Sequence, residues 1–313
     1  MNPPAISIKN LSKAYKKIKA VDNVSFDILE GEFFGYLGPN GAGKTTTINS
    51  IVGLTNFDSG SVKVMGLDVV KDYVKARKLI GFAQQELSFD PFLSVREILL
   101  YQGGYFEMKG KALEARVEEL LKQFNLKHQE KDDFRKLSGG MKRRLQLAKA
   151  LMHEPKILIL DEPSAGVDVE LRHNLWRYLA KINKQGTTIL LTTHYIEEAE
   201  KLCERIGVIN RGKIIKLDSK ENLLKELSEQ LVLIELKEKI KKLPQSLQKH
   251  KCGLDLKKGV ITVKCRDAQK ELGGIVARLS REGLNVDNID IVKDDLEKIY
   301  IRLVGESDEF NGF

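Results

Sequence analysis

Gly38-Pro39-Asn40-Gly41-Ala42-Gly43-Lys44-Thr45 fits the pattern G-x-x-x-x-G-K-[ST], which describes a loop that binds the phosphates of a nucleoside triphosphate. Its glycines let the backbone curl so that successive N–H groups point inward toward an anion. Lys44 adds a positive charge for the β- and γ-phosphates, and the Thr45 hydroxyl can hold Mg²⁺. The octamer therefore predicts a nucleoside triphosphate site; the alternative is a glycine turn without a ligand.

The segments on either side of this loop favour the nucleotide site. Phe33 to Leu37 is a short apolar run, typical of a buried strand, and Thr45 to Leu54 has the pattern of a helix. The N-terminus of that helix would face the phosphates, where free N–H groups and the helix dipole favour an anion.

The composition is that of an ordinary folded protein. Of the 313 residues, 42% are hydrophobic and 31% charged, and the net charge is +8. The lysines are spread along the chain, which favours a solvated basic surface over a patch for nucleic acid or an anionic membrane.

Cys203, Cys252 and Cys265 lack metal or redox spacing and indicate a reducing compartment. We find no signal-peptide core and no uncharged apolar run near the roughly 20 residues that span a bilayer, so a membrane role would need a partner.

The order of the predicted elements indicates an α/β chain with two domains. Residues 5–218 would form the larger domain, which starts with an antiparallel sheet and continues with parallel strands joined by crossover helices. Residues 92–152 are predicted to be a helical insert within it. Residues 219–230 would form a linker helix, and residues 231–305 a small α+β accessory domain that supports a dimer or regulates the larger one.

The helical insert has clear start signals. Ser94 has capping-box spacing to Glu97 and should begin a helix. A further helix should follow Ser138 and end at Pro155. Its polar face would carry five long side chains: Lys142, Arg143, Arg144, Gln146 and Lys149.

Two acids follow a buried strand. Ile157 to Leu160 is entirely aliphatic, and Asp161 and Glu162 come directly after it, at the end where open α/β sheets bind ligands. Asp161 can help to hold Mg²⁺, and Glu162 can orient the attacking water or accept its proton. Adjacent carboxylates also occur in helix caps, but behind a phosphate loop they favour catalysis.

A second anion site is predicted at Ser138-Gly139-Gly140, where a hydroxyl and two small residues open a helix. The alternative is an ordinary serine N-cap. From the residues alone, the site could serve the nucleotide of the same chain or that of a partner chain.

Tyr15 lies in a predicted loop between two of the first strands. An aromatic ring near a phosphate loop can stack on adenine, although an isolated loop tyrosine is usually only partly buried surface.

Five motifs in this order resemble the nucleotide-binding subunit of ABC transporters across residues 5–218: the phosphate loop, Gln85, Leu137 to Gly140, Asp161-Glu162, and His194 after Thr192-Thr193. The resemblance implies a P-loop NTPase fold and a homodimer arranged head to tail. Each ATP would then lie between the phosphate loop of one chain and Ser138-Gly139-Gly140 of the other.

The resemblance also implies roles for single residues. Gly38 through Thr45 and Thr46 would bind ATP, with Tyr15 on the adenine and Asp168 across the dimer. Gln85, chosen over Gln84 because the latter occupies the strand exit, would sense Mg²⁺ and the attacking water. Mg²⁺ would be held by Thr45, Gln85 and Asp161. The catalytic residues would be Glu162, His194, Gln85 and Lys44, with His194 contacting the γ-phosphate and holding Glu162 in place.

One departure refines the match. Met141 replaces the usual glutamine after the signature glycines, so an amide contact is absent there. Four stretches look most like ATPases paired with ABC-2-type permeases, many of which are bacterial exporters: Met141, the run Lys142-Arg143-Arg144, the segment Ser164 to Arg172, and the segment Thr193 to Glu200.

We therefore expect an ATPase that powers export through a separate membrane permease, located in the cytoplasm on the inner face of the cell membrane. The aromatic segment Leu87 to Tyr105, with Phe89, Phe92 and Tyr101, is the candidate docking surface for the permease; the alternative is core packing.

A rival hypothesis is a soluble ABC ATPase acting on ribosomes or nucleic acid, but only one cassette and no coiled coil are present. A small-molecule kinase would leave Ser138 and His194 unexplained. We expect no nucleic acid partner and no metal beyond Mg²⁺.

Overall fold

The computed structural model describes residues 4–164, 168–227, 230–237, 240, 242–247, 252–255, 259–265, 268–293 and 295–309. The chain divides into two compact units, and the smaller one comprises Glu221–Gly305. We describe each unit by itself. Among the described residues, no helix combines the length and the apolar character that a membrane span requires.

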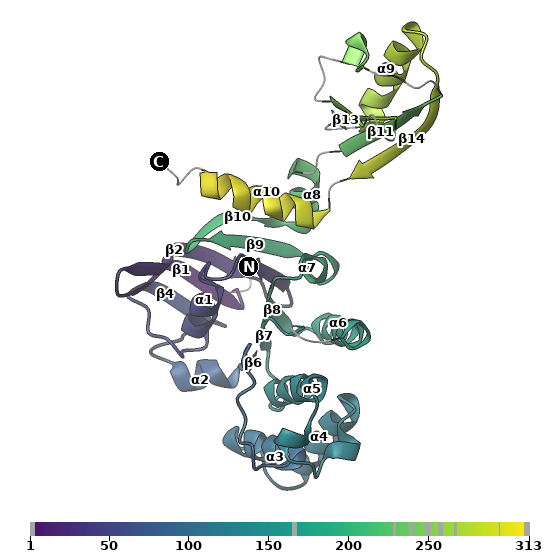
Figure 1. Ribbon diagram of the computed structural model, residues 1–313. Coiled ribbons are helices and arrows are strands. Elements are labelled where there is room, and N and C mark those ends of the chain that lie inside the picture. Colours follow the sequence, from purple (N-terminus) through teal and green to yellow (C-terminus); the bar gives the residue numbers. More distant parts are fainter. Residues whose placement is uncertain are drawn as a thin grey trace. The chain divides into compact units, whose positions relative to one another are not determined.

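A six-stranded sheet of order β10-β9-β3-β8-β7-β6 forms the centre of the larger unit (Figure 1). Its strands are β3 (Phe33–Leu37), β6 (Ile80–Ala83), β7 (Ile157–Asp161), β8 (Thr188–Thr193), β9 (Arg205–Asn210) and β10 (Lys213–Ser219). All pairs are parallel except the β9–β10 hairpin. Every residue of β3, β7 and β8 is buried, as their apolar sequences predict. The predicted α/β class is confirmed.

An antiparallel sheet of order β2-β1-β4-β5 is the second layer. It contains β1 (Ile6–Tyr15), β2 (Ile18–Ile28), β4 (Ser59–Val64) and β5 (Leu67–Asp68). One prediction is wrong here: Tyr15 is not in a loop but is the last residue of β1, where it pairs with Ile18. The strand runs further than its apolar alternation indicated, because the hairpin ladder continues to its tip.

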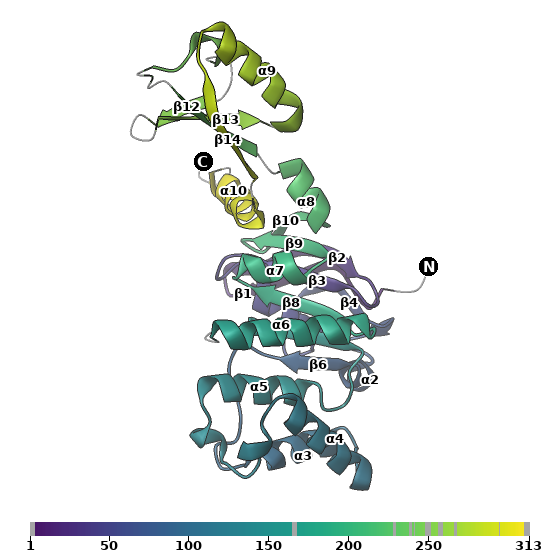
Figure 2. The ribbon, with the colours of Figure 1, turned by 90° about the vertical axis from the view of Figure 1, so that its right-hand side faces the viewer.

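Helices fill the space around these sheets. The helix α1 (Lys44–Ile51) packs between them, since Ile48 and Ile51 share one core with strands of both. In Figure 2, α6 (Val169–Lys184) and α7 (Ile196–Leu202) lie across the opposite face of the central sheet. The short α2 (Tyr73–Lys78) leads into β6. This arrangement leaves the carboxyl ends of β3, β7 and β8 free for a site.

The helical insert consists of α3 (Val95–Tyr105), α4 (Gly110–Gln123), η1 (Lys127–Gln129), η2 (Phe134–Lys136) and α5 (Gly139–Ala150). The capping box predicted at Ser94 and Glu97 is present in full. The predicted end of the last helix is wrong, since α5 stops at Ala150 rather than at Pro155. The turn after it places Leu151 and Met152 in the core, which ends the helix before the proline is reached.

The smaller unit is an antiparallel sheet with one helix packed on it. Its strands are β12 (Cys252–Asp255), β13 (Val260–Cys265), β11 (Gln230–Leu236) and β14 (Val286–Lys293), in this spatial order. The helix α9 (Ala268–Arg281) contributes Ile275 and Leu279 to its core. The remaining elements that lie wholly or partly in this unit are α8 (Lys220–Leu227), η3 (Gln245–Leu247) and α10 (Leu296–Glu309). The strand β12 is short and lies among polar residues, so the sequence gives little strand signal for it.

Candidate functional site

The phosphate loop joins β3 to α1 and is closely packed at two glycines. Gly43 has a φ of 109°, a conformation that side chains disfavour. A Cβ atom there would lie 2.3 Å from the carbonyl oxygen of Ala20, and one at Gly38 would lie 2.4 Å from that of Ile209. The loop is therefore held in place by β2 and β9, which explains why glycine is required at both positions.

Lys44 is held inside this loop. Lys44 is only 5% exposed, and its Nζ donates hydrogen bonds to the carbonyl oxygens of Gly38 at 2.6 Å and Pro39 at 3.1 Å. Burial lowers the pKa of the Lys44 ammonium, and the charges of Glu162 and Asp161 oppose that shift. The loop thus holds a cation against the backbone that would cradle a phosphate.

Asp161 lies beside the first turn of α1. Thr45 Oγ1 donates to Asp161 Oδ2 at 3.2 Å, and Thr192 Oγ1 donates to Asp161 Oδ1 at 2.5 Å. A hydroxyl and a carboxylate are the hard oxygen ligands that Mg²⁺ prefers. The residues present therefore fit a Mg²⁺ site formed by Thr45 and Asp161, at the end of β7.

Glu162 adopts an unusual backbone conformation directly after β7. Its φ is 50°, and its N–H donates to the carbonyl oxygen of Thr192 at 3.0 Å. Its carboxylate Oε2 accepts a hydrogen bond from Gln85 Nε2 at 3.1 Å and lies 3.2 Å from His194 Nδ1. The fold thus brings three predicted catalytic side chains together, and it is Gln85, rather than Gln84, whose side chain reaches Glu162.

Other predicted site residues lie apart from this group. Ser138 is exposed and caps α5, accepting from the N–H of Met141 at 3.3 Å; no hydrogen bond joins it to the phosphate loop of its own chain within the described residues. Gly139 and Gly140 form the first turn of α5. Asp168 is exposed before α6 and follows residues 165–167, which lie outside the described residues.

Tyr15 is placed near the phosphate loop through its hairpin. The ring is half-exposed at the end of β1, and Ala20 of the neighbouring strand touches the loop at Gly43. A half-exposed ring is available for stacking on a base.

Arg143 is a site residue that sequence reasoning missed. We expected it on the solvent face of its helix, yet it is buried, with 5% exposure, and so is Gln146 at 4%. Its guanidinium donates to carbonyl oxygens of both acids and of the segment that holds Gln85. A basic run gives no signal that one of its members faces inward, because the carbonyl partners belong to distant segments.

A second missed residue is Glu198 of α7, which is fully buried. Its carboxylate accepts from Ser164 Oγ at 2.9 Å and from Trp176 Nε1 at 2.8 Å, and it is also hydrogen-bonded to Thr193. Burial raises the pKa of Glu198 above its usual value. This carboxylate therefore links the turn after Glu162 to the end of β8, where His194 follows.

Comparison with known proteins identifies relatives of this chain. The family model described as ABC transporter matches residues 21–165. The linearmycin resistance ATP-binding protein LnrL of Bacillus subtilis is 34% identical over 310 residues, which cover 96% of this chain and 99% of that protein. The Nod factor export ATP-binding protein I of Burkholderia lata is 43% identical over 210 residues, covering 67% of this chain and 69% of that protein.

Solved structures agree with these relatives. A chain described as the ATP binding subunit of an ABC transporter has a TM-score of 0.67 at 26% identity and covers 71% of this chain and 92% of that one. A dimeric post-hydrolysis cassette, MJ0796 bound to ADP and Pi, has a TM-score of 0.65 at 29% identity and covers 68% and 98%. The resemblance inferred from the five motifs is confirmed, as are ATP hydrolysis and the use of ATP with Mg²⁺. The chain belongs to the family of ABC transporter ATP-binding subunits.

Proposed function

We propose that this chain is the ATP-hydrolysing subunit of an exporter, which acts through a separately encoded permease of the ABC-2 type on the inner face of the cell membrane. Relatives that carry "resistance" and "export" in their names support this direction. The match to the linearmycin resistance protein also extends through the smaller unit. Cargo contacts would lie on the permease.

The observation that carries the proposal is a site in two halves. Glu162, Gln85 and His194 meet at one edge of the central sheet, whereas Ser138 presents its exposed hydroxyl without a contact to that edge in the described structure. Two chains packed head to tail would bring Ser138 of one against the nucleotide of the other. ATP binding would then close a homodimer, with Asp168 at the junction.

Hydrolysis would follow from the groups around Glu162. A water molecule attacks the γ-phosphorus, the bond from phosphorus to the β–γ bridging oxygen breaks, and ADP and inorganic phosphate leave. Glu162 accepts the proton of this water, while Gln85 orients it and His194 contacts the γ-phosphate. Lys44 balances charge on the β- and γ-phosphates. Mg²⁺, when held by Thr45, Asp161 and Gln85, supplies further neutralisation of the phosphate oxygens.

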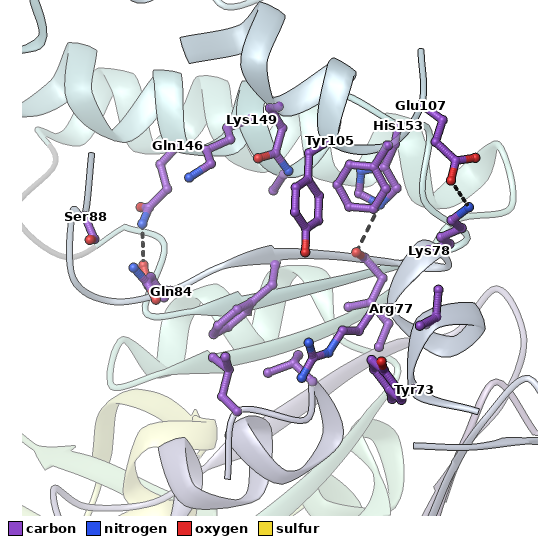
Figure 3. Close-up of a pocket in the computed structure, with 18 of the residues that line it drawn as sticks. Tyr73, Arg77, Lys78, Gln84, Ser88, Tyr105, Glu107, Gln146, Lys149 and His153 are labelled. Carbon is purple, nitrogen blue, oxygen red and sulfur yellow. Dashed lines mark hydrogen bonds and ion pairs between the residues drawn. The ribbon is translucent and has the colours of Figure 1, made fainter. Parts of the chain in front are cut away.

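The permease would dock in a groove of about 500 Å³ beside the helical insert (Figure 3). Tyr105 and Lys149 line the groove from the insert, and Tyr73 and Arg77 line it from α2. Tyr105 is 78% exposed, and Phe92 and Tyr101 are similarly open, so three of the four aromatic side chains named in this segment are available to a partner, whereas Phe89 packs against Phe134.

The charges of the groove indicate what its occupant carries. The Lys149 ammonium lies 5.0 Å from the centre of the Phe89 ring, and burial lowers the Lys149 pKa. In the part of the chain that the structure describes, Lys149 has no carboxylate partner. We expect an amphipathic permease segment with apolar residues for Tyr105 and an acidic side chain for Lys149. Gln84 lines the groove. A movement of the bound permease segment would therefore displace Gln84 and, with it, the neighbouring Gln85.

The two-chain site is tested with Glu162→Gln, which should bind ATP and accumulate as a dimer at saturating ATP. A monomer under these conditions, measured by light scattering, would contradict the composite site. The Lys44→Ala variant should lose most of its affinity for nucleotide. It serves as the control in which ATP cannot close the dimer.

The transport role is tested by purifying the chain with its cellular partners. We expect an integral membrane protein, and Tyr105→Ser together with Lys149→Glu should release it without changing the basal ATPase rate. Recovery with ribosomes or nucleic acid and without a membrane protein would favour the rival function.

A further inference from the structure

Arg143 lies where three parts of the site meet. It is in the second turn of α5, the helix that Ser138 caps, and its side chain points into the protein beneath the ends of β6 and β7. Because β6 and β7 are parallel neighbours, the carbonyl groups after both strands meet at one edge of the sheet. Arg143 occupies this edge as a buried cation.

All three nitrogen groups of the guanidinium are used. Nε donates to the carbonyl oxygen of Pro163 at 2.6 Å, and Nη2 donates to those of Asp161, at 3.1 Å, and Glu162. Nη1 donates to the carbonyl oxygens of Gln84 at 3.0 Å and Gln85 at 3.3 Å and to the side chain of Gln146. No other natural side chain presents five N–H donors in a rigid plane, so lysine could not reproduce this set.

A second link from the same helix runs parallel to this one. Gln146, one turn after Arg143, donates from Nε2 to the carbonyl oxygens of Gln84 at 2.8 Å and Glu86 at 3.0 Å. The segment that carries Gln85 is therefore attached to α5 at both of its neighbours. Since an α-helix moves as a rigid element, a displacement of Ser138 is passed to these carbonyl groups.

We propose that Arg143 is a positioning residue that couples Ser138, at the partner's nucleotide, to Glu162 and Gln85 of its own chain. The inference rests on the composite site proposed above. When closure draws the N-terminus of α5 onto the partner's ATP, Arg143 sets the backbone of both catalytic segments. Each chain thereby hydrolyses its own ATP only after it has engaged that of its partner.

The first experiment compares Arg143→Gln and Arg143→Lys with wild type. Both should lower kcat on the order of 10–100-fold, as misplacing a catalytic group does, while the Kd for ATP changes less than about twofold. The control is Arg116→Gln, because Arg116 donates to the carbonyl oxygens of Leu151, at 2.8 Å, and Met152 in the same insert, away from the site. A kcat that falls no more than in the Arg116 variant, at equal thermal stability, would overturn the positioning role.

The second experiment tests the coupling by a double-mutant cycle with Ser138→Arg, which blocks engagement of the partner's ATP. In that background Arg143→Gln should lower kcat by less than about twofold. If its full effect persists, the two residues act independently and the coupling is wrong.

The Glu162→Gln variant distinguishes a failure of the proposed dimer from a failure of the coupling. If Glu162→Gln alone stays monomeric with ATP, the composite site is wrong and the coupling falls with it. If that variant dimerises, with and without Arg143→Gln, but the cycle is additive, only the coupling is wrong.

Discussion

Replacing Glu198 by glutamine tests how firmly the two turns that carry the proposed catalytic residues Glu162 and His194 are held together. The wild-type carboxylate is fully buried and accepts hydrogen bonds from Ser164, Trp176 and Thr193. Glutamine has nearly the same shape, but one of its two terminal groups is an NH₂ that can only donate. The hydroxyl of Ser164 or Thr193 must then turn to accept from this NH₂, so that its own proton loses the carboxylate as an acceptor.

The expected loss follows from these contacts. A hydrogen bond to a charged group contributes about 1.5–3 kcal/mol, and a buried donor left unpaired costs about 1–3 kcal/mol. The neutral amide avoids the desolvation of a buried carboxylate, which offsets part of this loss. We expect Glu198→Gln to lower the free energy of unfolding by about 2 kcal/mol, or the Tm by roughly 4–8 °C.

Trp176 is the only tryptophan of the chain and donates directly to Glu198, so its fluorescence reports on this cluster during denaturant unfolding. Glu197→Gln is the matched control, because Glu197 is exposed and its ion pair among the described residues is with Lys201 on the surface. It should stay within about 0.5 kcal/mol of wild type. Glu198→Gln within that same range would refute the reasoning.

The pKa of Glu198 adds a pH dependence to this comparison. Because the folded state raises this pKa above 4.5, the folded protein binds more protons than the unfolded chain as pH rises from that value. The contribution of Glu198 to stability is therefore complete below pH 4.5 and decreases as pH rises toward the folded pKa. The advantage of wild type over the glutamine variant should shrink across that window.

Two further perturbations test other parts of the structure. Gly43→Ala should lower ATP affinity at least tenfold in a titration, because its Cβ would lie 2.3 Å from the Ala20 carbonyl oxygen, whereas Gly110→Ala, with φ 58° and no atom within 4 Å, should leave affinity unchanged. Burial lowers the pKa of His153 to about 4, below its unfolded value of 6.5, so the unfolded chain binds more protons between these values and stability should fall as pH decreases from 7 to 4. His153→Phe should reduce that slope in melting curves, and an unchanged slope would assign the pH dependence elsewhere.

Local patterns predicted the elements that depend on neighbours in sequence. The short aliphatic run Ile157 to Leu160 predicts a buried strand and forms one, and Ser94 with Glu97 forms the capping box that its spacing indicates. The phosphate loop is equally local, because its glycines and Lys44 shape one turn between a strand and a helix. Such features require no knowledge of the rest of the fold.

The missed residues depend on partners far along the chain. Arg143 contacts carbonyl groups of Gln84 and Glu162, and Glu198 contacts Ser164 and Trp176. A charged side chain is stable inside a protein only when such partners surround it, and pattern alone assigns it to solvent. Charged residues that stand among other charged residues on a helix are therefore where sequence interpretation fails, and here two of them face inward beside the site.

The conformation of Glu162 gives a physical reason for the proposed coupling of hydrolysis to distant parts of the structure. A φ of 50° costs a glutamate on the order of 1–3 kcal/mol, which contacts from other segments must offset. Each such contact contributes about 1 kcal/mol. They come from Thr192 of β8, from Gln85 next to the groove, from His194 and from Arg143. Four contacts of about 1 kcal/mol exceed a cost of about 1–3 kcal/mol by the equivalent of about one to three contacts, so loss of the contact beside the groove or of the one from α5 destabilises the turn. The Glu162 carboxylate is thus held in place only while contacts from several segments are made together, as the proposed control of the hydrolysis rate by dimer closure requires.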